Sequence, residues 1–147
     1  MPPVKTALPV FSSPGKVSHQ NSPKSGPRIL LVDDDEVLRE LVAEALIMNG
    51  YEVVCAEDGQ AGWDSLSQLE FDLMITDHNM PRLNGLDLIR KMKCGLPQVP
   101  TIMITGYVPY RFEASDNILP FCDVMAKPFS LQELLQKVDN SLKLAQA

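Results

Sequence analysis

Residues 71–85 read FDLMITDHNMPRLNG, and this stretch is the strongest single indication of the fold. Residues 73–76 form a short, mostly apolar run, which is typical of a strand buried on both faces of a parallel sheet. Asp77 follows directly, and a carboxylate at the end of a buried strand costs free energy unless it has a role there. Pro81 and Gly85 then supply turn residues that lead into a helix.

The same alternation of apolar runs and helical stripes extends outward from this stretch in both directions. Ser130 and Glu133 form a capping box at the start of the clearest helix. Strands that alternate with helices predict an α/β fold with a doubly wound, five-stranded parallel sheet and helices on both faces. The predicted strands are 29–32, 51–55, 73–76, 101–104 and 121–126, and the predicted helices are 35–49, 58–69, 85–93, 109–117 and 130–142.

Composition divides the 147 residues into a tail and one folded domain. Residues 1–27 hold six of the twelve prolines, five serines and three lysines without an acidic residue, which predicts a disordered basic tail. Residues 28–147 carry the remaining charge of −9 and are expected to form a single domain. An acidic body argues against direct nucleic-acid binding, since phosphate backbones require a basic surface.

The three cysteines, Cys55, Cys94 and Cys122, have no C-x-x-C spacing and are expected to be free thiols in a reducing compartment. No apolar stretch approaches the roughly 20 residues that cross a membrane. The N-terminus also lacks the apolar segment of a signal peptide. These features favour a cytoplasmic protein without membrane contact, and the oligomeric state is expected to be a monomer or a weak dimer.

Polar residues stand at the ends of four predicted strands. Asp33 and Asp34 follow the first strand, Asp77 the third, Thr105 the fourth and Lys127 the fifth. In such sheets the binding crevice lies beyond the carboxyl ends of the strands, so these loops should meet at one edge. Clustered carboxylates favour Mg²⁺ binding, while a lysine and a hydroxyl suit a phosphoryl group. One carboxylate could then serve as nucleophile.

Four motifs resemble the receiver domain of two-component response regulators, and the chain is similar to the single-domain chemotaxis type over residues 28–143. The motifs are ILLVDDD at 29–35, DHNMPRLNG at 77–85, IMITG at 102–106 and AKPF at 126–129. The resemblance implies a flavodoxin-like strand order of 2-1-3-4-5. It also implies that a partner histidine kinase or histidine phosphotransfer protein donates a phosphoryl group to Asp77.

The resemblance implies a role for each residue of the site. Asp34 and Asp77 are expected to bind Mg²⁺ directly, the backbone carbonyl of Asn79 to be the third protein ligand, and Asp33 to act largely through water. For the phosphoryl group, Thr105 is expected to donate a hydrogen bond and Lys127 to pair with its charge. The Lys127–Pro128 peptide bond is expected to be cis.

The sequence departs from the family at position 124, where Val124 replaces the usual Tyr or Phe. A valine is stiff at χ1 and too small for the family's aromatic switch. Our hypothesis is that the signal passes through the backbone after Thr105, at Gly106, or through Tyr107 or Tyr110. Tyr107 could also shield the acyl phosphate from water, whereas His78 is expected to be an ordinary loop side chain.

Simpler explanations exist for single residues. Asp33, Asp34 or Asp35 could merely cap the first helix, Thr105 could be an ordinary strand residue, and Lys127 could be a solvated surface lysine. Two other functions also remain open: a receiver-fold interaction or phosphate-sink protein that does not switch, and an aspartate-nucleophile phosphatase. The phosphatase is disfavoured because Asn79 stands where a second acid would be needed, so we expect no turnover of a separate substrate.

Overall fold

Five parallel strands form the central layer of the structure, a computed structural model that describes residues 26–95, 99–106 and 122–146. The strand order is β2-β1-β3-β4-β5, which confirms the expected order. The strands are β1 (Arg28–Val32), β2 (Glu52–Ala56), β3 (Leu73–Asp77), β4 (Thr101–Thr105) and β5 (Cys122–Ala126). The described helices are α2 (Glu36–Met48), α3 (Gly59–Gln68), α4 (Gly85–Gly95) and α6 (Leu131–Gln146).

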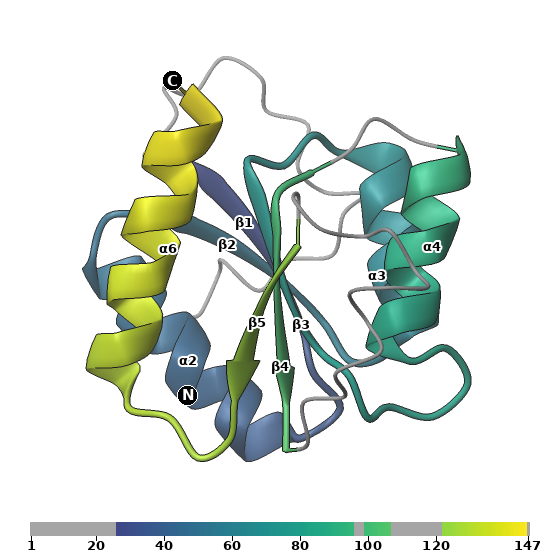
Figure 1. The fold of residues 1–147 in the computed structure, drawn as a ribbon, viewed down its shortest axis with the longest axis horizontal. Helices are drawn as coiled ribbons and strands as arrows, with labels where there is room; N and C mark the ends of the chain where they lie inside the picture. The colour runs from purple at the N-terminus through teal and green to yellow at the C-terminus, as the bar shows by residue number, and fades with distance from the viewer. Residues whose placement is uncertain (1–25, 96–98, 107–121, 147) are drawn as a thin grey trace, which may run out of the picture.

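The helices cover both faces of the sheet, as the sequence predicted. Figure 1 shows α2 and α6 on one side and α3 and α4 on the other. Successive β1 residues serve opposite faces, because side chains alternate along a strand. Ile29 and Leu31 belong to the core under α2 and α6, whereas Leu30 and Val32 belong to the core under α3 and α4. The continuous apolar runs therefore reflect a sheet that is buried on both faces.

Local capping explains where α2, α3 and α6 begin. The Asp35 side chain accepts a hydrogen bond from Leu38 N at the start of α2, and Asp58 accepts one from Ala61 N at the start of α3. The capping box at α6 is reciprocal, with Ser130 N donating to Glu133 and Glu133 N donating to Ser130. These short polar side chains satisfy backbone donors that the first helical turn leaves unpaired.

Several sequence predictions lie outside the described residues: most of the 1–27 tail, the helix at 109–117, and residue 121 of the fifth strand. Among the helices that the structure describes, none is long and apolar enough to cross a membrane.

Candidate functional site

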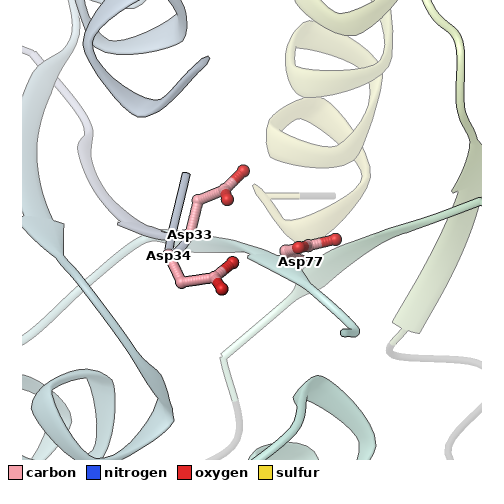
Figure 2. A group of neighbouring side chains, drawn as sticks. All are labelled: Asp33, Asp34 and Asp77. Carbon is pink, nitrogen blue, oxygen red and sulfur yellow. The ribbon is translucent and has the colours of Figure 1, made fainter. Parts of the chain in front are cut away.

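Three carboxylates meet at the carboxyl edge of the sheet. Asp33 and Asp34 follow β1, and Asp77 is the last residue of the neighbouring strand β3. One carboxylate oxygen from each lies within 4.8 Å of the other two. Figure 2 shows how β1 and β3 bring these side chains to the same edge. The parallel pairing of β1 with β3 thus creates the acidic cluster, defined as Asp33, Asp34 and Asp77.

Asp77 is buried, and its environment is set mainly by Lys127. The Asp77 side chain is 5% exposed, and Lys127 Nζ lies 3.1 Å from its Oδ1. The two charged groups form an ion pair. The contact does not have the geometry of a hydrogen bond, and no described residue donates one to Oδ1. Lys127 N also donates to Thr105 O, at 2.9 Å, which fixes the start of the loop after β5 beside β4.

Asp33 is the second buried acid of the cluster. Burial raises the pKa of Asp33 to about 6, and the nearby Asp77 and Asp34 carboxylates add to this effect. The backbone N–H of Asp35 and the charge of Lys127 oppose it. Arg39 Nη1 donates to the backbone oxygen of Asp33 at 2.7 Å, so α2 helps hold this strand end in place.

The acidic cluster fits a hard divalent cation. It offers carboxylate oxygens, which Mg²⁺ prefers, and the exposed side of Asp34 leaves room for the waters that Mg²⁺ retains. Burial and the two neighbouring carboxylates raise the pKa of Asp33, so an additional cation beside Lys127 would favour the fully ionised cluster. No described residue donates a hydrogen bond to Asp77 Oδ1, so this oxygen could still bind a cation.

The loop 78–84 follows Asp77 and leads into α4. His78 N donates to Ile104 O, and Gly85 N donates to His78 O at 3.0 Å, so the base of the loop is closed. Gly85 is required there, because a Cβ would lie 2.6 Å from Asp77 O. His78 Nδ1 accepts a hydrogen bond from the backbone N–H of Leu86, with 3.4 Å between the two nitrogens. The histidine therefore contacts the start of α4, a contact that the sequence did not suggest.

Asn79 is exposed on this loop, two residues after Asp77 of the acidic cluster. Its assignment as a backbone metal ligand stays a prediction.

The remaining predicted residues lie on β4, on β5 and beyond them. Thr105 is buried at the end of β4, in register with Ala126 of β5. Gly106 is exposed, whereas Tyr107 and Tyr110 lie outside the described residues. Val124 pairs in register with Met103 and packs half-buried against the core under α3 and α4. The Lys127–Pro128 bond is cis, as expected.

Sequence reasoning missed an ion pair beside the loop. Arg82 Nη2 donates to Asp58 Oδ2, and Asp58 is buried at the start of α3. Arg82 also has a φ of 69°, a left-handed conformation that is uncommon for residues other than glycine. An Asp-Gly pair before a helix is a signal for a cap, but no local pattern links it to an arginine 24 residues later.

Fold and acidic cluster together define a receiver-type signalling domain, and comparison with known proteins gives its family. A family model described as the response regulator receiver domain matches residues 29–139. The chain therefore belongs to the response regulator receiver domain family of two-component signalling. Response regulator MprA of Mycolicibacterium vanbaalenii is 34% identical over 115 residues, which cover 76% of this chain and 48% of that protein. The chain thus spans about half the length of the curated relatives it matches.

Solved receiver structures share the fold. The receiver domain of the hybrid histidine kinase CckA is 29% identical, with a TM-score of 0.67 over 78% of this chain and 98% of that one. The receiver domain of sensor histidine kinase PA1611 from Pseudomonas aeruginosa is 27% identical, with a TM-score of 0.66 over 80% and 98%. That structure contains a magnesium ion coordinated in the active site cleft.

Proposed function

We propose that this receiver domain accepts a phosphoryl group on Asp77 from a phosphohistidine of a partner kinase or phosphotransfer protein. The observation that carries the proposal is the arrangement around Asp77. Its carboxylate shares an acidic cluster with Asp33 and Asp34 and lies 3.1 Å from Lys127 Nζ. A buried acid between further acids and one lysine is costly as a structural element, and it suits an acceptor that works with cations.

The chemistry is a substitution at phosphorus. An oxygen of Asp77 attacks the phosphorus, the new O–P bond forms as the N–P bond breaks, and the electron pair returns to the histidine nitrogen. Lys127 Nζ, already beside Asp77 Oδ1, would pair with the charge of the incoming phosphoryl oxygens, and the Thr105 hydroxyl would donate to one of them. Phosphoryl transfer depends mainly on such positioning and charge compensation.

Asp34, Asp77 and the backbone carbonyl of Asn79 would hold Mg²⁺, with Asp33 acting through water. When bound, Mg²⁺ neutralises charge on the carboxylates and on the phosphoryl oxygens. The magnesium ion reported in the PA1611 receiver supports this assignment, as does the fit of the acidic cluster to a hard cation.

An exposed, mainly apolar stripe on α2, formed by Val37, Leu41 and Met48 and interrupted by the exposed Glu44, supports binding of a partner. The three apolar side chains are 77%, 49% and 78% exposed, and helical spacing places them on one face. Exposed apolar patches commonly mark interaction sites. Because α2 starts directly after Asp35, a helical phosphohistidine protein seated on the stripe would lie beside the acidic cluster. We also propose a cytoplasmic location, since the thiols are free and reduced thiols persist there.

The decisive experiment is stoichiometric labelling with acetyl phosphate, followed by intact-protein mass spectrometry. We expect labelling of the full chain with Mg²⁺, and none with a chelator or in Asp77→Asn. The matched control is Asp35→Asn, which removes a neighbouring exposed acid but keeps a side chain that caps α2 well. Labelling that persists in Asp77→Asn would refute the assignment of the acceptor.

Val124 favours a second candidate function, a receiver-fold interaction protein that does not switch. Its half-buried packing against the core gives the site no aromatic ring to reorient. Amide chemical shifts with and without a phosphoryl mimic distinguish the two functions. Shifts in residues 106–125 indicate switching, and a spectrum unchanged there indicates a static interaction module. Receiver domains act as signalling modules, and sustained hydrolysis of a phosphomonoester would instead indicate an enzyme.

A further inference from the structure

The loop that carries Asn79 is anchored at its base, in its middle and at its tip. The base is closed by the hydrogen bond from Gly85 N to His78 O. In the middle, Met80 is buried in the core under α3 and α4. At the tip, Arg82 reaches Asp58 at the start of α3. Asn79 lies between the first two anchors, so its backbone position depends on how the whole loop is held.

The anchor at the tip joins two loops that are distant in sequence. The Asp58 side chain is 8% exposed and accepts hydrogen bonds from Ala61 N, at 2.8 Å, and from Arg82. Next to it, the backbones touch: a Cβ on Gly59 would lie 2.1 Å from Leu83 O. The start of α3 and the tip of the loop therefore form one packed unit.

Arg82 holds an unfavourable backbone conformation at this anchor. Its φ of 69° is left-handed, and Leu83 N donates to Pro81 O at 2.7 Å in the same tight turn. Glycine or asparagine would suit this conformation better. The Arg82 side chain is 67% exposed, so burial of apolar surface does not account for an arginine here. Its contact with a buried carboxylate does.

We propose that Asp58 and Arg82 are a positioning pair that fixes loop 78–84 and thereby the backbone carbonyl of Asn79 toward the metal. The inference rests on the proposed function, because it concerns the metal ligand set assigned there. Neither residue touches the acidic cluster in the contacts that the structure describes, and both act through the loop. The pair holds the loop in the same way that outer partners orient the ligands of metal sites in general.

The test compares Mg²⁺ affinity by calorimetric titration and the amide chemical shift of Asn79 in the Mg²⁺-free protein. Arg82→Gly removes the guanidinium and fits the left-handed conformation without strain, so a loss of affinity could not come from added backbone strain. We expect the Mg²⁺ Kd to rise about tenfold, which is the lower end of the losses in affinity seen when a residue that orients a metal ligand is removed. We also expect the amide chemical shift of Asn79 to change. Arg82→Lys keeps a cation and should recover most of the affinity.

Two further variants complete the design. Asp58→Asn keeps a capping oxygen but loses the charge, and should weaken Mg²⁺ binding as Arg82→Gly does. The double variant should be no weaker than either single one, since both remove the same interaction. Arg90→Ala is the matched control, because Arg90 is another exposed arginine paired with an aspartate, Asp87, on α4. It should leave both readouts unchanged.

The outcomes separate this inference from the proposed function. Wild-type affinity and an unmoved Asn79 amide in Arg82→Gly would overturn the positioning role while leaving the proposed function intact. Wild-type protein that binds no Mg²⁺ would overturn the metal assignment, and the Asn79 amide in the Mg²⁺-free variants would still decide whether the pair fixes the loop.

Discussion

Lys127 Nζ lies 3.1 Å from Asp77 Oδ1, so the ammonium stands at the edge of the acidic cluster that a metal ion would share. Two cations around one carboxylate repel each other, although each lowers the cost of ionised Asp77. Lys127 and Mg²⁺ should therefore compete electrostatically in the resting protein and cooperate only when a phosphoryl group brings additional negative charge.

Replacing Lys127 should separate these two effects. In Lys127→Met, we expect Mg²⁺ to bind more tightly, by up to roughly tenfold, because a nearby positive charge is lost. Labelling by acetyl phosphate should slow roughly a hundredfold, because preorganised charge stabilisation is lost. Titration calorimetry and timed mass spectrometry measure both quantities. Weaker Mg²⁺ binding in the variant would contradict the competition.

Asp33 should reduce the stability of the metal-free protein. Burial raises its pKa to about 6, so its ionised form weakens the folded state at neutral pH. Asp33→Asn retains an oxygen that can accept from Asp35 N, and we expect the free energy of unfolding to rise by roughly 1–3 kcal/mol without Mg²⁺. Urea unfolding measures it. Added Mg²⁺ should stabilise the wild type more than the variant, and equal gains would count against Asp33 as part of the metal site.

The contact between α3 and the loop tip predicts a steric effect. Gly59→Ala places a methyl group against Leu83 O, a backbone atom that cannot move independently. We expect a loss of about 1–3 kcal/mol in the free energy of unfolding, as for other overpacked sites. Gly95→Ala is the control, since among the described residues its Cβ would meet the Trp63 ring at an ordinary 3.6 Å. Thermal unfolding of the two variants checks this. Equal stability would show that loop 78–84 moves to accommodate the methyl group.

Asp58 should make stability depend on pH in the acidic range. The hydrogen bond from Ala61 N lowers its pKa most, followed by the hydrogen bond from Arg82. A carboxylate with a lowered pKa stabilises the fold above its unfolded-state pKa, about 3.9, and this contribution is lost as the pH falls through the folded value. Arg82→Gly should lose less stability between pH 7 and acid than the wild type. Urea unfolding midpoints of the wild type and of Arg82→Gly, measured across that pH range, check this. A constant difference between the two midpoints would contradict the ion pair in solution.

The apolar stripe on α2 predicts a difference between donors. Leu41→Glu should slow transfer from a phosphorylated histidine phosphotransfer protein roughly tenfold or more, since a charge enters an apolar contact. Labelling by acetyl phosphate should remain unchanged, because a small donor needs no docking surface. Leu144→Glu, an exposed leucine on α6, is the matched control. Equal rates for Leu41→Glu and wild type with the protein donor would place docking elsewhere.

Much of the site followed from the sequence because parallel strands end at one edge. Once residues 29–32 and 73–76 are assigned as parallel strands, Asp33, Asp34 and Asp77 are expected at the same edge of the sheet. That the two strands are neighbours is what the family resemblance implied. The cap residues of α2 and α6 were likewise evident, because capping is a local interaction between residues about three positions apart. The fold class and the acidic cluster therefore required no three-dimensional information.

Other contacts could not be read from local pattern. The pairing of Asp58 with Arg82 depends on the path of two loops and on a left-handed residue without glycine at position 82. His78 was expected to be an ordinary loop side chain, and its contact with Leu86 N depends on the rotation of the imidazole. Helix α4 continues to Gly95, two residues beyond the predicted end, because sequence signals locate a helix end only to within one or two residues.

Val124 lies in register with Met103, with its side chain half-buried against the core under α3 and α4. A β-branched side chain is restricted at χ1, so Val124 has little freedom to reorient. If Asp77 is phosphorylated, information that leaves along β4 and β5 would consequently travel as a displacement of the main chain. Such a receiver would pass on the state of Asp77 without the rotation of a ring at position 124.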